Sequence, residues 1–541
     1  MSVRALDAID LAVLHHRFAA IADEMGVVLG RSGFSPNIKE RHDYSCAVFD
    51  LAGRMVAHAA HVPVHLGSTP LSVRAALGAF RLAPGDVVAL NDPYAGGTHL
   101  PDVTLVAPAH DARGRLLGFV ADRAHHADMG GMSAGSMPLA REIYQEGFRM
   151  PPVRLVRRGA LDRDILTLFL ANTRVPEERR GDLDAQLAAL AIGASRVREL
   201  AVAIGVARLH RGMAALQRYT ARLMATTLRT LRPGRYAAVD FLDDDGLDAR
   251  AVPIRVAITI RDGRALVDFT GSARQVEGSL NANYAITLSA VFYVFTALGR
   301  EPIPANEGLL ERIRVVAPSG TIVNAEFPAA VAGGNVETSQ RIVDVLLRAL
   351  AKAAPGRIPA ASAGTMNNVA VGGFDDVRGR AFSYYETLAG GAGGGPTGGG
   401  ASAVHTHMTN TLNTPIEALE TYYPLRVERY AIRRRSGGAG RNPGGDGIIR
   451  ELRFLTDADL TLLTERRRRA PYGLAGGSGG RVGRNLLAHA GRWRALPGKL
   501  NMRVRRGDVL RLETPGGGGW GPSRNPTGSR YSRRRSRRPP R

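Results

Sequence analysis

Apolar side chains near the N-terminus repeat with helical spacing. They recur at intervals of four, three, four and three residues, at Leu14, Phe18, Ile21, Met25 and Val28. This spacing lays one apolar stripe along a helix, which is typical of a helix packed against another element. Serine, glycine and proline in residues 31–36 predict its end.

The chain then changes to a strand pattern. Apolar residues 45–50 and 54–58 flank Leu51-Ala52-Gly53 and predict a hairpin. A loop follows that contains His58, His61 and His65. These histidines are candidates to support a metal ligand or to contact substrate, although histidines that are simply hydrogen-bonded within a loop are the commoner outcome.

Three further apolar runs predict strands at residues 85–90, 102–108 and 116–124. The first ends in the turn residues Asn-Asp-Pro and Gly-Gly, and the polar segment 111–114 separates the other two. We therefore expect the last two strands to pair as an antiparallel hairpin. This pairing sets residues 123–125 opposite Asp102.

Candidate metal ligands meet at the open end of this hairpin, namely His99, Asp102, His125 and His126. The pairing also predicts that His126 lies close to His99. Imidazole and carboxylate groups bind divalent transition ions at about 2.0–2.2 Å, and three such ligands with an open position suit a catalytic site. Strand alternation points only one of the two adjacent histidines inward, and the sequence leaves open which one. The alternative is a set of polar strand-end residues hydrogen-bonded to loops.

The rest of the pattern predicts an α+β protein with several domains, mixed sheets, a central helical segment and a mainly β C-terminal region. The proline-free stretch between Pro176 and Pro233 predicts two or three helices, with Gly193 and Gly205 as candidate breaks. Strands are expected at 254–260 and 265–269, and helices at 285–298 and 336–351.

These patterns divide the chain into five regions. They are an N-terminal α+β region with the metal site, a helical segment, an α+β region for substrate or interfaces with a glycine-rich loop, a mainly β domain and a basic disordered tail. The regions cover residues 1–175, 176–233, 234–424, 425–521 and 522–541.

The formal charge of +23 does not by itself indicate a nucleic-acid-binding protein. Lysine occurs at only three positions, Lys39, Lys352 and Lys499, and the abundance of Ala, Gly and Arg indicates a bias towards GC-rich codons. Much of the excess lies in the tail, where only nonspecific contact with nucleic acid or anionic lipid is expected. Specific nucleic-acid and membrane partners are therefore not predicted.

Cys46 is the only cysteine, so an intrachain disulfide is excluded, and its alternation with apolar residues predicts a buried, inert thiol.

No window of 18 uncharged apolar residues occurs, and the N-terminus lacks a signal-peptide core. We expect a cytoplasmic protein. The glycine-rich run 390–400 lacks the lysine of a P-loop and the placement of a dinucleotide fingerprint, so no ATP site is predicted. The run is expected to be either a flexible loop or a backbone that approaches a ligand or another chain closely.

Several motifs together resemble the hydantoinase B/oxoprolinase family, over about Asp7 to Gly521. They are Arg31-Ser32 with residues 34–41, then residues 61–67, 91–102, 124–128, 146–152, 334–341, 384–387 and 404–411. The resemblance implies a separate A-type ATPase subunit or domain, which phosphorylates a carbonyl or enol oxygen, and a B-type chain, which completes hydrolysis or carboxylation. In carboxylase members a His-x-x-Asp pair and a later histidine hold a divalent metal, which corresponds here to His99, Asp102 and the His125/His126 pair.

Other polar residues of these motifs are candidates for further roles. Asp128 or Glu146 is a candidate general base or partner of a ligand histidine. Asn335, Glu337 and Gln340 are expected at a helix start, where they bind substrate or cap the helix. His405 and His407 would share one face of a strand and contact substrate.

Three functional hypotheses follow. The leading one is the metal-containing B-type component of an ATP-dependent cyclic-amide hydrolase, which cleaves carbon–nitrogen bonds as a hetero-oligomer with an A-type ATPase subunit. The second is the carboxylating subunit of an ATP-dependent ketone carboxylase, and the third is a non-catalytic structural subunit. The ligand types are compatible with zinc, manganese or iron.

Overall fold

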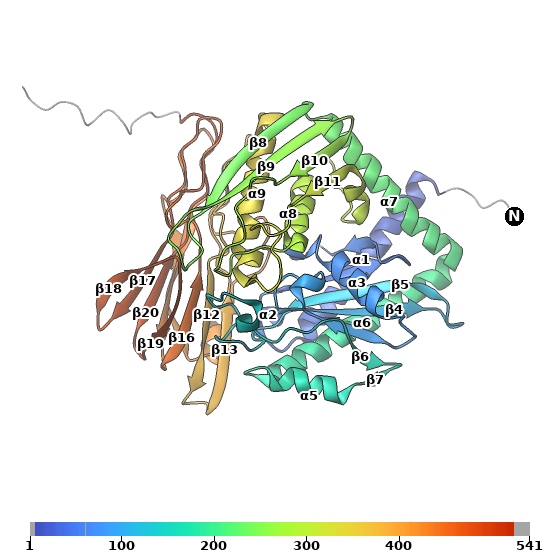
Figure 1. The fold of residues 1–541 in the computed structure, drawn as a ribbon, viewed down its shortest axis with the longest axis horizontal. Coiled ribbons are helices and arrows are strands. Elements are labelled where there is room, and N and C mark those ends of the chain that lie inside the picture. Colours follow the sequence, from blue (N-terminus) through green and yellow to red (C-terminus); the bar gives the residue numbers. More distant parts are fainter. Residues whose placement is uncertain (1–5, 60, 524–541) are drawn as a thin grey trace, which may run out of the picture.

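A computed structural model describes residues 6–59 and 61–523, in which helices join four β-sheets (Figure 1). The sheet that carries the candidate metal ligands has seven strands in the order β2-β1-β5-β4-β3-β6-β7. They are β1 (Tyr44–Phe49), β2 (Met55–His58), β3 (Val87–Leu90), β4 (Asp102–His110), β5 (Leu116–His125), β6 (Val153–Arg157) and β7 (Ala160–Leu161). The predicted β1–β2 and β4–β5 hairpins are confirmed.

Side chains of this sheet alternate between two buried faces, as the pleat of a strand requires. Ala47 and Phe49 of β1 belong to one hydrophobic core, whereas Cys46 and Val48 belong to another. The prediction of a buried thiol at Cys46 is therefore confirmed. A sheet with two buried faces offers two environments to residues that are adjacent in the sequence.

Different helices cover the two faces. We call the face beneath α1 (Ala8–Ser32) and α6 (Pro176–Ile204) the helix face, since both helices pack against its strands and against each other. We call the opposite face the cavity face; α3 (Thr69–Ala79) and η1 (Pro63–His65) lie over it, and α8 (Tyr284–Ala297) packs on η1. The predicted apolar stripe of α1 is buried at Leu14, Phe18, Ile21 and Met25.

The central helical segment consists of α6 and α7 (Val206–Arg229), with the predicted break at Gly205. Gly205 has a φ of 84°, a conformation that favours glycine. The predicted break at Gly193 was wrong, because this residue lies inside α6. A side chain there would collide with the Met25 sulfur of α1, so Gly193 serves close helix packing.

A four-stranded sheet in the order β11-β10-β9-β8 follows the helices. Its strands are β8 (Gly234–Leu242), β9 (Val252–Arg261), β10 (Arg264–Asp268) and β11 (Ile313–Val316). Helix α9 (Ser339–Ala353) packs on β8, β9 and α8. The π-helical turn η4 (Gly334–Thr338) precedes α9 directly, and it directs residues of this region towards the first sheet.

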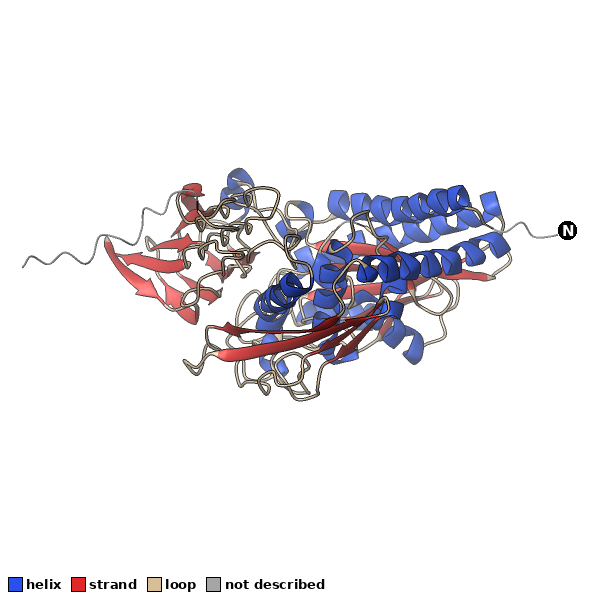
Figure 2. Cartoon of the chain, turned by 90° about the horizontal axis from the view of Figure 1, so that it is seen from above, coloured by secondary structure: helices blue, strands red, loops and turns tan. Residues whose placement is uncertain are grey.

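Two sheets that share one hydrophobic core form the C-terminal region, at the opposite end of the molecule from the long helices (Figure 2). One contains β12 (Asn368–Asp375), β13 (Arg380–Glu386), β16 (Ala458–Leu463) and β19 (Lys499–Val504). The other contains β14 (Leu425–Arg433), β15 (Gly447–Phe454), β17 (Arg484–His489), β18 (Arg492–Leu496) and β20 (Val509–Glu513). Because β12 pairs with β16, this β region includes strands that precede residue 425.

Short helices complete the described secondary structure, namely α2 (Pro36–Lys39), η2 (Pro93–Ala95), α4 (Ile143–Glu146), α5 (Arg163–Ala171), η3 (Glu307–Arg312) and α10 (Ile416–Tyr422). Across residues 6–59 and 61–523 the helices are too short or too polar to span a membrane. Residues 524–541, most of the predicted tail, lie outside the described residues.

The glycine-rich run 390–400 is an ordered part of a bundle of extended segments. Its amides bond to neighbouring segments, as in Gly391 N–H to the Pro515 carbonyl and Gly394 N–H to the Gly518 carbonyl. A methyl group on Gly391 would collide with the Gly445 carbonyl, so only glycine permits this spacing. The run is therefore not a loose loop, and the close approach that the sequence predicted to a ligand or another chain is made instead to segments of the same chain.

Candidate functional site

The β4–β5 hairpin and the segment before it bring three of the predicted metal ligands together. Asp102 pairs with His125 in the antiparallel register, as predicted. His99 Nε2 lies 3.3 Å from Asp102 Oδ2, and the His99 and His125 ring centroids are 5.0 Å apart. All three residues are at most 3 % exposed. The predicted clustering of these three residues is therefore observed.

Two further side chains join this cluster. His65 Nε2 lies 3.4 Å from Asp102 Oδ2, while its Nδ1 lies 2.8 Å from the Ser45 hydroxyl oxygen. Asp43 lines the same cavity as Asp102 and His125. The sequence pointed to His65 only as a candidate to support a metal ligand or to contact substrate, not as a member of the cluster. It contained no signal for Asp43, because Asp43 reaches the site only through the pairing of β1 with β5.

His126 lies on the other face of the sheet, so its predicted place beside His99 was wrong. Its Nε2 lies 2.9 Å from Gln186 Oε1 of α6, and its ring packs edge-on against Phe169 of α5. His125 lies nearest to His99 instead, because side chains alternate at the end of β5. His125 is therefore the member of the adjacent pair that belongs to the candidate metal site.

Several buried polar atoms of the cluster lack hydrogen bonds. Among the described residues, no hydrogen-bond partner exists for either ring nitrogen of His99, for Asp102 Oδ1 or for His125 Nε2. The other carboxylate oxygen, Asp102 Oδ2, accepts a hydrogen bond from the Thr98 hydroxyl. Buried polar atoms are nearly always hydrogen-bonded, so unpartnered nitrogen and oxygen atoms at one place fit a divalent transition metal. No group of three or more His, Cys, Asp and Glu side chains in the described residues is already arranged to hold a metal ion, so ligation requires these side chains to rotate.

The electrostatics of the cluster favour an ionised Asp102 and neutral imidazoles at His65 and His125. Burial opposes ionisation of Asp102, but His99 and His65 outweigh burial and hold its pKa well below the ordinary value. Burial lowers the pKa of His65, and burial together with His99 lowers the pKa of His125 well below the usual range. Metal ligation requires these protonation states, because protonated imidazole has no lone pair to donate.

A small cavity of about 20 Å³ lies beside the cluster. His65, Asp102 and His125 line one side, and residues of η4, β13 and the loop 408–411 line the other, among them Asn335, Tyr385 and Thr411. This volume accommodates one water or ion. A ring substrate requires the walls to move apart, and the non-helical loop 408–411 is the wall with the least regular structure.

The three polar residues at the start of α9 differ in their contacts. Asn335 lines the cavity, and no residue of the described chain bonds to its Oδ1. Glu337 Oε1 accepts hydrogen bonds from the Met366 amide (3.0 Å) and from Asn368 Nδ2 (2.7 Å), and burial raises the pKa of Glu337 to about 8. Gln340 Nε2 donates to the Thr406 carbonyl at 3.0 Å. These side chains form no helix cap, so the capping interpretation was wrong.

His405 and His407 lie in a loop, so the strand on which they would share one face is not formed. His407 has a φ of 61°, which is incompatible with a strand, and its Nδ1 lies 3.3 Å from the Tyr293 hydroxyl. His405 Nδ1 lies 3.3 Å from the Thr409 hydroxyl. Neither histidine lines the cavity, although the adjacent residues Met408 and Thr409 do.

Asp128 and Glu146 lie outside the cavity and bind backbone amides. Asp128 accepts hydrogen bonds from the Gly130, Gly135 and Arg174 amides and from the Arg174 guanidinium. Glu146 Oε1 accepts from the amides of residues 331 and 332, at 2.8 Å each, and burial raises its pKa to about 8. The structure does not bring either carboxylate to the cluster of candidate metal ligands. Their hydrogen bonds to backbone amides instead favour a role in stabilising the loops around them.

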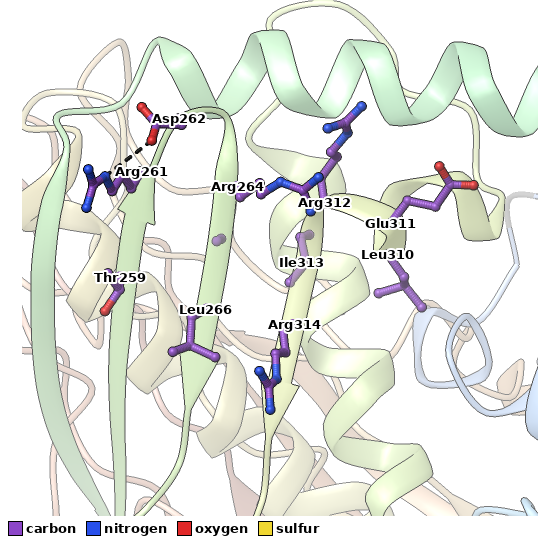
Figure 3. A pocket seen from close by; sticks show the side chains of 11 residues that line it. Thr259, Arg261, Asp262, Arg264, Leu266, Leu310, Glu311, Arg312, Ile313 and Arg314 are labelled. Carbon is purple, nitrogen blue, oxygen red and sulfur yellow. Dashed lines mark hydrogen bonds and ion pairs between the residues drawn. The ribbon is translucent and has the colours of Figure 1, made fainter.

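A surface groove elsewhere contains none of these residues. Arg261, Arg264, Arg312 and Arg314 line it, on β9, β10, η3 and β11 (Figure 3). Arg261, Arg264 and Arg314 are exposed, and Arg261 pairs with the neighbouring Asp262 at 3.2 Å. The site residues predicted from the sequence therefore lie apart from this groove.

Known proteins resemble this chain over most of its length. The family model for hydantoinase B/oxoprolinase matches residues 7–523. The B component of a putative D-/L-hydantoinase from Pseudomonas sp. strain NS671 is 31 % identical over 96 % of this chain and 90 % of its own. The 5-oxoprolinase 1 of Arabidopsis thaliana is 38 % identical over 95 % of this chain, which spans only 42 % of that relative's length.

A solved structure shows the same fold. The ATP-dependent caprolactamase from Pseudomonas jessenii superimposes with a TM-score of 0.89 and 28 % identity, covering 96 % of this chain and 92 % of that one. The likeness extends over all four sheets, because nearly the whole chain is covered. On the family match, the sequence identities and this fold, the chain belongs to the hydantoinase B/oxoprolinase family.

Proposed function

We propose that this chain is the metal-containing B-type component of an ATP-dependent cyclic-amide hydrolase. The observation that carries the proposal is the group of buried ring nitrogens and carboxylate oxygen of His99, Asp102 and His125 that lack hydrogen bonds, beside a small cavity. The names of a hydantoinase component, a 5-oxoprolinase and an ATP-dependent caprolactamase among similar proteins support hydrolysis of a carbon–nitrogen bond in a ring.

His99, Asp102 and His125 would hold a divalent zinc, manganese or iron ion, with His65 and Asp43 as additional donors. Such an ion lowers the pKa of a bound water and polarises a carbonyl oxygen. Asn335 presents an unpartnered amide oxygen to the cavity, which suits it to accept a hydrogen bond from a substrate N–H group. The burial of these side chains excludes bulk water from the site.

A partner is required because a cyclic amide is a poor electrophile, since the nitrogen lone pair stabilises its carbonyl. Conversion of the carbonyl oxygen to a phosphate ester supplies the missing activation, and this sequence contains neither a P-loop motif nor a dinucleotide fingerprint. We therefore assign ATP binding to a hydantoinase A-type subunit that assembles with this chain.

The test is to co-express the chain with an A-type partner, and to measure metal content by mass spectrometry and ATP consumption with several substrates. Stoichiometric metal and ATP use with a hydantoin, 5-oxoproline or caprolactam would support the hydrolase. ATP use only with acetone plus bicarbonate would replace it with the ketone carboxylase. A metal-free complex that consumes no ATP with any of these would favour a structural subunit.

A further inference from the structure

We propose that Asn37 is a positioning residue of the metal centre, because its side-chain amide sets which ring nitrogen of His125 faces the cavity. The inference rests on the metal centre of the proposed function. It also gives a role to Asn37, Arg41 and Tyr385, three residues of the family motifs that the proposed reaction does not use.

Asn37 binds the back of the His125 ring. Its Nδ2 lies 3.2 Å from His125 Nδ1, and Asn37 is only 2 % exposed. His125 Nε2, on the far side of the ring, has no hydrogen-bond partner within the described chain, and His125 lines the cavity. The contact therefore occupies Nδ1 and leaves Nε2 as the ring nitrogen without a partner.

Arg41 and Tyr385 hold this arrangement in place. The fully buried Arg41 donates from Nη1 to Asn37 Oδ1 (3.2 Å) and to the Tyr385 carbonyl (3.0 Å), and from Nη2 to the Thr387 hydroxyl (2.9 Å). The Tyr385 ring stacks on the His125 ring, with centroids 4.6 Å apart and planes 6° apart. The imidazole is thus held at its edge by an amide and at its face by an aromatic ring.

The donor and acceptor roles of Arg41 and Asn37 determine which ring nitrogen of His125 carries the proton. Arginine only donates, so Arg41 directs Asn37 Oδ1 towards itself and Asn37 Nδ2 towards His125. Nδ1 then accepts, and a neutral His125 carries its proton on Nε2. Coordination through Nε2 requires the proton on Nδ1 instead, hydrogen-bonded to an oxygen.

A rotation of the Asn37 amide by half a turn supplies that oxygen. Arg41 would lose one hydrogen bond but keep the Tyr385 carbonyl and the Thr387 hydroxyl as acceptors. An aspartate at position 37 would accept from Arg41 and from His125 Nδ1 at the same time, without any rotation. Asn37→Asp should therefore favour the form of His125 that can bind a metal through Nε2. Asn37→Ala should remove the hydrogen bond to His125 Nδ1 altogether.

The experiment measures Zn²⁺ affinity of the full chain by competition with a fluorescent chelator, together with thermal unfolding. We expect Asn37→Ala to weaken Zn²⁺ binding by about 10- to 100-fold, and Asn37→Asp to bind at least as tightly as wild type. Gln186→Ala is the matched control, since Gln186 makes the equivalent amide contact to His126 on the helix face. It should leave Zn²⁺ affinity unchanged.

The outcomes separate this inference from the proposed function. A wild-type chain that binds neither Zn²⁺ nor Mn²⁺ would remove the metal centre itself. A wild-type chain that binds Zn²⁺ while folded Asn37→Ala binds equally well would overturn the positioning role alone. If Asn37→Ala does not fold, the Zn²⁺ affinity of Asn37→Asp tests the positioning role instead. Weaker Zn²⁺ binding by Asn37→Asp than by wild type would also overturn the proposal.

Discussion

The two faces of the seven-stranded sheet carry similar polar residues that differ in their surroundings. On the cavity face, the His99 ring has no hydrogen bond within the described chain, although its Nε2 lies 3.3 Å from Asp102 Oδ2. On the helix face, Gln186 bridges His126 Nε2 (2.9 Å), Asp122 Oδ1 (2.8 Å) and the Val103 carbonyl (3.0 Å). Unpartnered atoms remain on the helix face as well, at His126 Nδ1 and Asp122 Oδ2, so the difference between the faces lies in the shared amide bridge on one and the cavity lined by His65, Asp102 and His125 on the other.

The same contrast separates two buried aspartates on adjacent strands. The histidines beside Asp102 overcome burial and keep the pKa of this carboxyl well below the ordinary range. Asp122 has only a neutral amide beside it, and burial raises its pKa well above the ordinary value. The surroundings therefore favour the ionised form of Asp102 and the neutral form of Asp122, although both are fully buried. Burial alone does not determine the charge of a carboxyl group.

Removal of a cavity-face ligand should have the largest effect. We expect His99→Ala and Asp102→Ala to lose bound metal and to reduce turnover with an A-type partner by more than about 100-fold, while thermal unfolding stays cooperative. Metal analysis and ATP consumption provide the measurement. His126→Ala is the control on the helix face and should keep both metal and turnover per folded molecule. Retained metal and activity in His99→Ala and Asp102→Ala would contradict the site.

The hydrogen bonds of Gln186 on the helix face should contribute to the free energy of unfolding rather than to metal binding. Gln186→Ala leaves His126, Asp122 and the Val103 carbonyl without their shared partner, so unfolding should become easier by about 1–3 kcal/mol. Chemical denaturation measures this difference, and metal content should stay at the wild-type level. A loss of metal without a loss of stability would reverse the assignment of the two faces.

A substitution of Asp122 tests the difference in pKa between the Asp102 and Asp122 carboxyl groups. The folded state holds a proton on Asp122 above the unfolded pKa of about 3.9, so the stability from this group is complete below that pH and is lost as pH rises through the raised folded pKa. Asp122→Asn mimics the neutral form. It should flatten the fall of stability with rising pH, by on the order of 1 kcal/mol per pH unit. Parallel pH profiles for variant and wild type would contradict a neutral Asp122.

Glu146 provides the smallest expected effect. Glu146→Gln preserves an acceptor for the amides of residues 331 and 332, and burial already raises the pKa of Glu146 to about 8. The change in turnover should therefore stay far below the about 10²-fold loss that follows removal of a general base. Steady-state kinetics checks this. A drop of that size would restore Glu146 as a catalytic residue.

Much of the candidate site was predictable from local patterns. The turn residues between β4 and β5 predicted the hairpin, and the hairpin alone sets Asp102 opposite His125. The face of each histidine was not predictable, because a shift of one residue inverts the alternation of a strand. Asp43 and His65 were missed as members of the cluster for another reason, since they arrive from β1 and η1, and pairing between distant strands leaves little trace in a single sequence.

The sequence by itself determined the family, the main helices and hairpins, and the types of donor atom at the site. Only the tertiary structure decided that His125 and not His126 faces the cavity, that Asp128 and Glu146 bind loop amides, and that the glycine-rich run packs inside a bundle of its own chain. The physical reason is the range of the interactions. Periodicity and turn chemistry act between neighbours in the chain, whereas burial, hydrogen-bond partners and pKa depend on segments that meet only after folding.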